Sequence, residues 1–539
     1  MATHVVTGLV RASVDLRTAS RDAGIACLAM LGASAFTIIV GLFGQFVEEW
    51  LIVDVLDIGH ALLAAIVLCG GMAIAAQRPG REGVVAAALA GIGTGALLAI
   101  LVALARAADL RWMFISLTVP ALREVAYRLD GIEAVLLLAA AGGLICALGA
   151  LIRLAPDRTR GIILGAILGV VCAGLLRELF RSMLDGLGRI DRLAFSFQGM
   201  LPQGAVVAAL VGGFIGARPF AALSVRARLG LGALGLVFVL ALPALTNDFV
   251  AQIMLLVCLY TLMGMGLNIE LGLAGLVDLG FVAFFAVGAY TMALLTGGSE
   301  QSIANLNPFV ALIFCILFAA FFGFLFGLPV LKVRGDYLAI ATLGLGEIIR
   351  VLVLSDMLRP VLGGAQGLVA VPKPVVFGLE LGTPTQMFYL AVALTAAAGY
   401  LAWRLQHSGL GRRWTAVRED EDVAQALGIN LVQIKLYAYT MGAAFAGLGG
   451  GIFAMMVGSV FPQSFQLLVS INVLAILVVG GIGSLAGVLV GAIVLIGIPE
   501  VLRDLGEYRY LIYGLTIIAV VRLRPQGLSP VRIRQREAL

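Results

Sequence analysis

The sequence predicts an all-α fold: a polytopic helical bundle integral to a membrane, with about 15 spans, some of them broken or re-entrant. Of the 539 residues, 61% are apolar, whereas an ordinary soluble protein has about 45–50%. Charged residues make up 12%, about half the usual share. A soluble surface cannot hide so much apolar area, so the composition excludes a soluble enzyme, a disordered chain and a secreted disulfide scaffold. Long unbroken apolar stretches favour helices over a barrel of alternating strands.

The expected spans form two sets along the chain. Residues 24–46 open the first set; they would form about 34 Å of helix, a full span that is too long for a signal peptide. The first set comprises 24–46, 58–76, 83–105, 134–152, 161–176 and 203–217. The second set comprises 229–245, 249–267, 271–296, 308–331, 337–354, 387–403, 435–458, 470–497 and 508–521.

Basic residues orient the second set, because loops on the cytoplasmic side carry an excess of lysine and arginine. If the chain alternates, one side receives Arg218, Arg226, Arg228, Lys332, Arg334, Arg404, Arg412, Arg413, Arg418 and Lys435. The other side receives only Arg359 and Lys373 before residue 469. The first set shows no such bias, so its orientation depends on parity alone.

The C-terminal tail predicts a broken helix. It carries Arg522, Arg524, Arg532, Arg534 and Arg536, so it should lie on the cytoplasmic side, like the 404–434 loop. Three ordinary spans between loop and tail would put the tail outside. We therefore expect the stretch 470–497 to break into two short halves around its glycines at 480, 481 and 483, which a membrane tolerates inside protein or beside a cavity.

Small residues recur every four positions on three expected helices, a pattern that lets helix backbones approach closely. The three stripes are Gly161, Gly165 and Gly169; Gly483, Gly487 and Gly491; and Ala443, Gly447 and Gly451. Packing within the bundle is the favoured interpretation, and a substrate path is the alternative. The six cysteines lie singly in apolar stretches and read as small buried residues.

The segment 404–435 is the longest strongly charged cytoplasmic loop. Four acids at 419–422 precede an apolar group, and Gly428 follows it. Acids favour the first turn of a helix and a glycine favours its C-terminal end, so the pattern predicts a short helix outside the bilayer. A solvated loop does not need a capped helix, which favours a docking element for another protein.

Two spans carry intramembrane charges. Asp278 lies in the glycine-rich segment 268–295, where it either caps a broken helix through backbone N–H groups or lines a translocation path. These two interpretations are compatible. Glu347 and Arg350 are three residues apart and share a helical face, as an internal ion pair or as direct substrate contacts.

Several site types are missing from the sequence. No G-x-x-x-x-G-K-[ST] motif occurs, and none of the three lysines (Lys332, Lys373 and Lys435) lies in such a loop. Three scattered histidines do not predict a metal site, and no nucleophile–base pair suggests a catalytic residue. If ATP drives transport here, another subunit hydrolyses it.

Three stretches resemble the permease subunits of bacterial ATP-binding-cassette importers for branched-chain amino acids, of the larger type with an N-terminal extension. They are GLAGLVDLGFVAFFAVGAY (272–290), VRGDYLAIATLGLGEIIRVL with the following LGGAQGLVAVPKP (333–374), and AVREDEDVAQALGIN, KLYAYTMGAAFAGLGGGIFA and VLAILVVGGIGSLAGVLVGA within 416–492. The likeness covers roughly 229–528. It divides the chain into an N-terminal membrane extension, 1–220, of about six spans and without an assigned role, and a permease core, 221–539.

The resemblance implies partners and sites. The chain would pair with a related second permease, two cytoplasmic ATPase subunits and a periplasmic binding protein that delivers leucine, isoleucine or valine, and would itself hold no cofactor. It would lie in the bacterial inner membrane with both termini in the cytoplasm. The ATPase-coupling residues would be Ala416, Arg418, Glu419, Asp422, Ala424 and Gly428. The substrate path would include Asn268, Gly272, Gly275, Asp278, Gly280, Phe284, Glu347, Arg350, Gly480, Gly483 and Gly487.

Two alternatives remain at this point. Close relatives in the family transport urea or short amides, although LVDLG at 276–280 and PKP at 372–374 look more like the branched-chain group. From a different class, the chain would be an ion-coupled secondary transporter or a channel acting alone, with Asp278, Glu347 and Arg350 as coupling sites.

Overall fold

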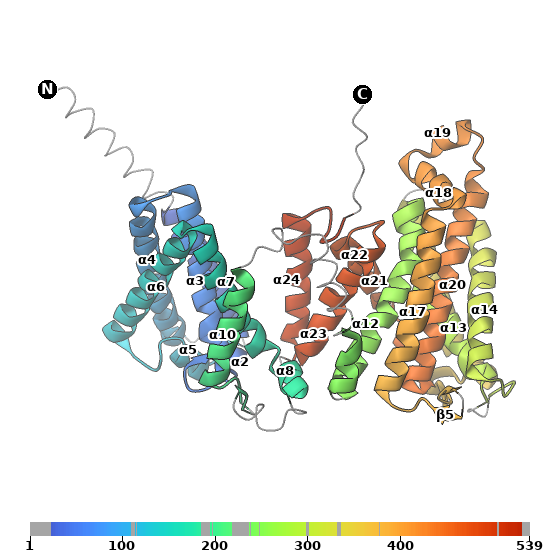
Figure 1. Cartoon of the computed structure of the whole chain (residues 1–539), viewed down its shortest axis with the longest axis horizontal. Helices are drawn as coiled ribbons and strands as arrows, with labels where there is room; N and C mark the ends of the chain where they lie inside the picture. Colours follow the sequence, from blue (N-terminus) through green and yellow to red (C-terminus); the bar gives the residue numbers. More distant parts are fainter. Residues whose placement is uncertain are drawn as a thin grey trace. The chain divides into compact units, whose positions relative to one another are not determined.

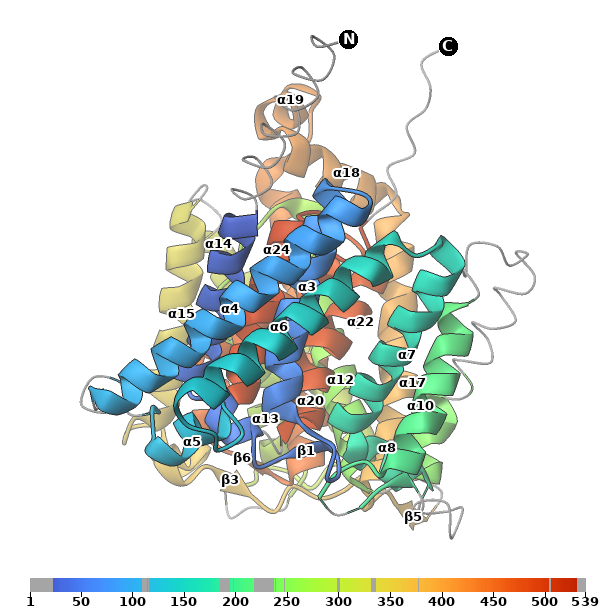
Figure 2. The ribbon, with the colours of Figure 1, turned by 90° about the vertical axis from the view of Figure 1, so that its left-hand side faces the viewer.

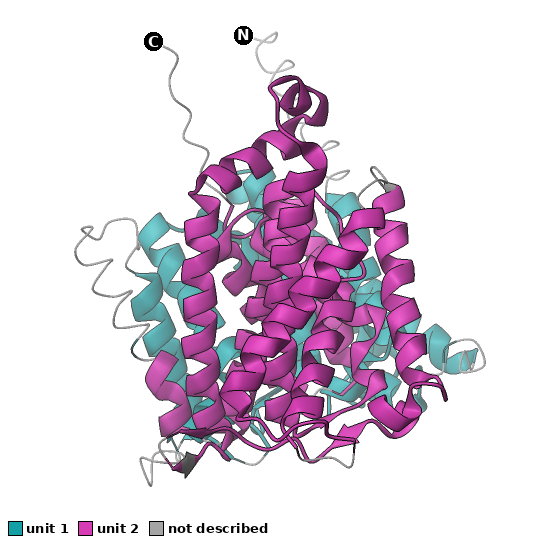
Figure 3. Cartoon of the chain, turned by 90° about the vertical axis from the view of Figure 1, so that its right-hand side faces the viewer, with its two compact units in different colours: residues 1–238 teal, residues 239–539 magenta. Residues whose placement is uncertain are grey.

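A computed structural model describes residues 23–108, 114, 116–184, 194–196, 198–217, 237, 239–246, 248–297, 301–330, 336–376, 378–503 and 506–530. The chain forms two compact units, residues 1–238 and 239–539, which are coloured separately in Figure 3 and treated separately below. The boundary expected at residue 220 and both chain termini lie outside the described residues. So do Lys332, Arg334 and the last three arginines of the tail.

Unit 1 consists mainly of helices (Figures 1 and 2). Its helices are Ala23–Ile39, α2 (Leu42–Phe46), α3 (Ile58–Gln77), α4 (Arg81–Ala107), α5 (Val119–Glu124), α6 (Gly131–Leu154), α7 (Asp157–Leu175), α8 (Arg177–Leu184) and α10 (Pro202–Gly216). α6 packs against both α3 and α4. The contact with α4 is close because a Cβ at Gly91 would lie 2.2 Å from the carbonyl oxygen of Gly142. Only glycine permits that approach of two backbones.

The glycine stripe at 161, 165 and 169 packs α7 against α10. Cβ atoms at Gly161, Gly165 and Gly169 would lie 2.3–2.4 Å from carbonyl oxygens of α10. The bundle-packing interpretation of this stripe is therefore confirmed. A short hairpin of β1 (Trp50–Ile52) and β2 (Leu56–Asp57) leads into α3, whose first turn is capped by the Asp57 carboxylate.

Unit 2 surrounds the long helix α20 (Leu431–Val457), which packs against α13 and α14 (Figure 1). The other long helices of this unit are α12 (Asp248–Leu267), α13 (Val282–Leu295), α14 (Pro308–Val330), α15 (Asp336–Leu354), α17 (Pro384–Gln406) and α24 (Tyr508–Leu523). The small-residue face of α20 meets α14, because a Cβ at Gly447 would lie 2.3 Å from Cβ of Ala319. The stripe of Ala443, Gly447 and Gly451 is therefore also a packing surface.

Shorter elements of unit 2 connect and interrupt these helices. They are η4 (Asn268–Leu273), α16 (Arg359–Leu362), η5 (Gly364–Gln366), α18 (Gly409–Glu419), α19 (Glu421–Ala426), η6 (Pro462–Phe465), α21 (Leu467–Gly480), α22 (Leu485–Ala492), η7 (Ile493–Gly497) and α23 (Ile498–Val501). Two antiparallel strand pairs join β3 (Leu368–Val369) to β6 (Ser459–Val460) and β4 (Val375–Val376) to β5 (Leu379–Glu380).

Lys373 caps the C-terminal end of α20. Its ammonium donates to the carbonyl oxygens of Met455 and Met456 at 2.9 and 2.8 Å. A cation satisfies these last carbonyls, which have no partner within the helix. Partial burial lowers the pKa of Lys373 below its usual value.

Within the described residues, nine helices are long and apolar enough to span a membrane, or ten if one bent pair is counted as a span. The expected number of about 15 is not confirmed. Three expected spans are instead shorter helices, at Ala23–Ile39, Pro202–Gly216 and Val282–Leu295, and the span at 229–245 falls mostly outside the described residues. The break expected in 470–497 is confirmed: α21 and the helix that follows it meet at 116°.

Candidate functional site

The first helix break, residues 268–281, separates α12 from α13 and is called break one below. The chain passes through a π-helical turn, η4, and then an irregular stretch before α13 begins at Val282. Gly275 takes a left-handed φ of 75°, which favours glycine. Oδ1 of Asp278 accepts the backbone N–H of Gly280 at 2.7 Å, so Asp278 caps the turn as the capping interpretation expects. π-helical turns of this kind often mark functional sites.

Helix α15 closes one side of break one. A Cβ at Gly280 would lie 2.0 Å from the carbonyl oxygen of Thr342, so the two backbones touch. The Thr342 hydroxyl accepts the N–H of Leu279 at 3.1 Å. On another side, the Ser470 hydroxyl of α21 accepts the N–H of Val282 at 2.9 Å. Side chains thus satisfy N–H groups that the irregular backbone leaves without helical partners.

The second helix break, residues 481–484, separates α21 from α22 and is called break two below. Gly481 and Gly483 have φ of 120° and 86°, and Ser484 then caps α22 by accepting the N–H of Gly487 at 3.0 Å. The two half-helices fold tightly together, because a Cβ at Gly480 would lie 2.0 Å from the carbonyl oxygen of Gly487. The predicted glycines therefore make both the turn and the contact.

The segment that follows α24 also covers break two. Leu528 donates its N–H to Val479 at 2.9 Å, and Ser529 donates to Gly480 at 2.8 Å. These bonds satisfy carbonyl oxygens at the end of α21.

Asn268 joins the two breaks. Its side-chain oxygen accepts the N–H of Gly483 at 2.8 Å, across 215 residues of sequence. Gln406 of α17 donates to the carbonyl oxygen of the same Gly483 at 3.2 Å. Both polar groups of one residue in break two are therefore held by side chains from other elements.

A buried polar cluster lies beside break one. Asn268, Glu270, Asp278 and Tyr439 are each at most 1% exposed. Apart from the interaction of the Glu270 and Asp278 carboxyl groups with each other, no hydrogen-bond partner among the described residues reaches the carboxylate oxygens of Glu270, Oδ2 of Asp278 or the Tyr439 hydroxyl. The ring of Phe284 meets that of Tyr439 edge-on at 5.4 Å. Buried groups of this kind are costly, and inside a membrane protein they indicate function more often than stability.

Glu270 is packed tightly into this cluster. A Cβ at Gly442 of α20 would lie 1.8 Å from its Oε1, so the glycine makes room for the carboxyl group. Asp278 lies within electrostatic reach of it. A change in the charge of Glu270 or Asp278, or a shift of α20, would therefore affect the structure of break one.

The segment 404–435 folds into two short helices at one end of α17 and α20 (Figure 1). Oδ1 of Asp420 caps α19 by accepting the N–H groups of Asp422 and Val423, both at 3.0 Å. Gly428 follows with φ of 83°. The predicted helix is confirmed as α19, whereas α18 is an additional helix that the pattern did not predict.

α18 and α19 are fixed to α20 by two polar contacts. The indole N–H of the fully buried Trp414 donates to the carbonyl oxygen of Ile434 at 2.9 Å. Lys435, which is 5% exposed, pairs with Glu421 at 2.5 Å. These contacts hold the segment as one body on the end of the bundle.

Arg418 connects α18 to break one. Its guanidinium donates to the carbonyl oxygen of Gly272, at the end of η4. A Cβ at Gly275 would lie 2.8 Å from Cγ of Arg418, so the side chain lies directly against the left-handed turn. Movement of α18 would therefore pull on the backbone of break one.

The remaining expected coupling residues lie on both sides of this segment. Glu419 and Asp422 are exposed, Ala416 is half-buried, and Ala424 packs inward at 1% exposure. Two large apolar side chains, Val423 and Leu427, are 55% and 76% exposed. The outer surface thus mixes acids with apolar groups.

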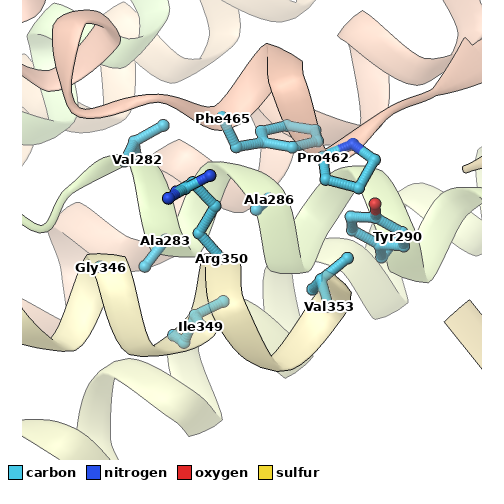
Figure 4. A pocket seen from close by; sticks show the side chains of 10 residues that line it. All are labelled: Val282, Ala283, Ala286, Tyr290, Gly346, Ile349, Arg350, Val353, Pro462 and Phe465. Atoms are coloured by element: carbon cyan, nitrogen blue, oxygen red, sulfur yellow. The ribbon is translucent and has the colours of Figure 1, made fainter. Parts of the chain in front are cut away.

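Glu347 and Arg350 form the expected ion pair on α15. Their side chains are 48% and 33% exposed, although both lie within a candidate span. Arg350 also lines a small pocket between α13 and α15, together with Tyr290 (Figure 4). Glu347 and Arg350 lie further along α15 than Thr342, which contacts break one.

The structure thus brings together Asn268, Gly272, Gly275, Asp278, Gly280 and Gly483, with Arg418 beside them. Sequence reasoning missed Glu270, Thr342, Tyr439 and Ser470. Glu270 carried a usable signal, because it is an ionisable residue inside an apolar run. The other three are ordinary residues whose role depends on long-range contacts.

The family model of the branched-chain amino acid transport system / permease component matches residues 249–521. The high-affinity branched-chain amino acid transport system permease protein LivM of Salmonella typhimurium is 38% identical over 331 residues, covering 57% of this chain and 76% of that protein. The LivM protein of Escherichia coli is 39% identical over the same shares. The permease protein LivH of Escherichia coli is 27% identical over 155 residues, covering 28% of this chain and 49% of that protein. No solved structure gives a significant match.

Proposed function

The chain belongs to the family of permease components of branched-chain amino acid transport systems, and from that premise we propose that it is the membrane-spanning subunit of an ATP-driven importer. It passes leucine, isoleucine or valine that a periplasmic binding protein delivers. ATP is hydrolysed on two cytoplasmic partner subunits. The chain lies in the bacterial inner membrane with both termini in the cytoplasm.

The hydrogen bond from Arg418 to Gly272 is the main support for this proposal, because it connects helix α18 of the cytoplasmic segment directly to the backbone of break one. An ATPase that moves α18 would shift η4, and Asn268 would pass the shift to Gly483 in break two. Two broken helices then move together in response to one docking event. Broken helices are the elements that transporters use at the substrate path.

The outer surface of α19 fits a protein partner. Val423 and Leu427 are exposed apolar side chains flanked by Glu419 and Asp422. Apolar anchors within a charged rim are typical of docking surfaces. We assign this surface to the ATPase.

The exposed ion pair on α15 supports a second permease as partner. A charged side chain facing lipid costs about 2.5–3.5 kcal/mol on insertion scales. Glu347 and Arg350 are half to one-third exposed in this chain alone. A second permease that covers α15 would take this pair out of lipid and place it beside the path between the two subunits.

The test is uptake into proteoliposomes that hold the chain with its purified second permease, ATPase and binding protein. Leucine, isoleucine and valine should enter only with ATP, and urea should not. ATP-dependent uptake of urea but not leucine would reassign the substrate. Uptake driven by an ion gradient without the ATPase would refute the importer and favour a secondary transporter.

Coupling is tested by Arg418→Gln. This variant should assemble with the ATPase and hydrolyse ATP at the basal rate, but lose most leucine uptake, since the bond to Gly272 is removed. Arg418→Lys retains a cation and should restore part of the uptake. Full uptake by Arg418→Gln would contradict the coupling role.

A further inference from the structure

A second pocket lies in unit 2, at the end of the bundle away from α18 and α19. It is lined by α12 near its start, by Met456 at the end of α20, and by Glu500 and Arg503 around the end of α23. α20 begins just after α19, and its 27 residues extend about 40 Å, so Met456 lies at the opposite end. In the proposed orientation this end faces the outside, where substrate arrives.

The pocket offers both signs of charge. Arg503 lies over the ring of Phe249, 4.4 Å from its centroid. A guanidinium that stacks through its face keeps its N–H donors in its own plane, where they can bind a carboxylate. The one ion pair of Glu500 within the described residues is a long contact with Arg509, at 3.4 Å. An ammonium group that approaches this carboxylate more closely can compete with Arg509.

The rest of the lining is mainly apolar. Ile253, Leu256 and Met456 join Phe249, and Gln252 adds an amide. The pocket holds about 370 Å³ of empty space, part of it open to the outside.

We propose that this pocket is an outer docking site for a zwitterionic α-amino acid with a branched apolar side chain. Arg503 binds the carboxylate, Glu500 binds the ammonium group, and Ile253, Leu256 and Met456 contact the side chain. The assignment rests on the proposed function and adds to it a place where substrate pauses before it reaches the breaks. Urea is uncharged, so it would form an ion pair with neither Arg503 nor Glu500.

A zwitterionic lipid headgroup offers the same pair of charges, so the experiment separates the two sources. A diazirine analogue of leucine is photo-crosslinked to the complete complex, and labelled peptides are mapped. We expect label on residues 249–256 of α12 or on the end of α20. Excess leucine should abolish it, whereas phosphoethanolamine and urea should not.

Variants link this label to transport. Arg503→Gln and Glu500→Gln should each lose the label and raise the concentration of leucine needed for half-maximal uptake about tenfold, the usual effect of removing one charged hydrogen bond. Arg503→Lys should lose less. Arg359→Gln and Asp356→Asn carry the same charge changes on exposed residues outside the pocket and should behave as the native chain.

The outcomes separate this proposal from the function on which it rests. If the native complex imports leucine but the pocket takes no label, or both pocket variants transport normally, the docking site is refuted and the importer stands. Competition by phosphoethanolamine but not leucine would replace it with a lipid site. A native complex that imports no branched-chain amino acid would refute both.

Discussion

The bond between Asn268 and Gly483 gives the sharpest test of the two-break arrangement. Asn268→Leu keeps the side-chain size but removes the oxygen that accepts the Gly483 N–H. Side-chain hydrogen bonds between membrane helices average about 0.6 kcal/mol, whereas a buried N–H left without an acceptor costs about 1–3 kcal/mol. Gly483 lies in a turn with φ of 86°, where no helical carbonyl can replace the lost acceptor. We therefore expect a loss of about 2 kcal/mol in the free energy of unfolding.

The assay is thermal unfolding of the purified chain in detergent, together with leucine uptake by the reconstituted complex. Asn268→Leu should lower the melting temperature by about 2–3 °C and reduce uptake more than stability alone explains. Asn472→Leu is the matched control, because Asn472 accepts a bond from the Tyr513 hydroxyl at 2.9 Å and, among the described residues, shares no hydrogen bond with either break. It should cost stability but leave uptake per folded complex unchanged. Native stability and uptake in Asn268→Leu would refute the link between the breaks.

Two further predictions concern backbone contacts. Gly480→Ala places a Cβ 2.0 Å from the carbonyl oxygen of Gly487, and no rotamer relieves this clash. It should therefore cost about 3 kcal/mol or more in the free energy of unfolding and lower the yield of folded protein. The control Gly514→Ala, whose Cβ would have nothing within 4 Å, should be neutral or slightly stabilising, and equal yields for both variants would contradict the tight fold of break two. Lys373→Met removes the cap on α20 and should lower the free energy of unfolding by about 1–3 kcal/mol, measured by a thermal melt. The control Arg359→Met changes an exposed basic residue of the same connection and should alter the free energy of unfolding by less than about 0.5 kcal/mol. Equal melting temperatures for the two variants would refute the stabilising role of the cap.

Local patterns in the sequence predicted several features of unit 2. Glycines 480, 481 and 483 together with the charge of the tail predicted the break in 470–497, and the structure has it. The acids at 419–422 and Gly428 predicted a short helix with acids in its first turn and a glycine at its end. In α19, Glu421 and Asp422 occupy the first turn and Gly428 follows the helix with a left-handed φ, whereas Asp420 is the N-cap. Each of these features is encoded within a few residues, because caps and left-handed turns depend on nearby backbone groups.

Other features could not be read from local patterns. The apolar run at 271–296 resembles a full span, but its first part is irregular and only 14 residues form α13. A buried helix and a lipid-facing helix are equally apolar, so composition alone overestimates the number of spans. The contacts of Asn268 with Gly483 and of Arg418 with Gly272 join residues 215 and 146 positions apart, which no local period encodes.

The long separation between Asn268 and Gly483 also sets an order of events during synthesis. At about 5–20 residues per second, roughly 10–40 seconds pass between translation of the two residues. During that interval break one enters the bilayer with the carboxyl groups of Glu270 and Asp278, while the side-chain amide of Asn268 does not yet have Gly483 as its partner. The nascent chain must therefore keep this region hydrated or sheltered by the insertion machinery until α21 and α22 arrive. Unit 2 consequently completes its core only when almost all of it has been made.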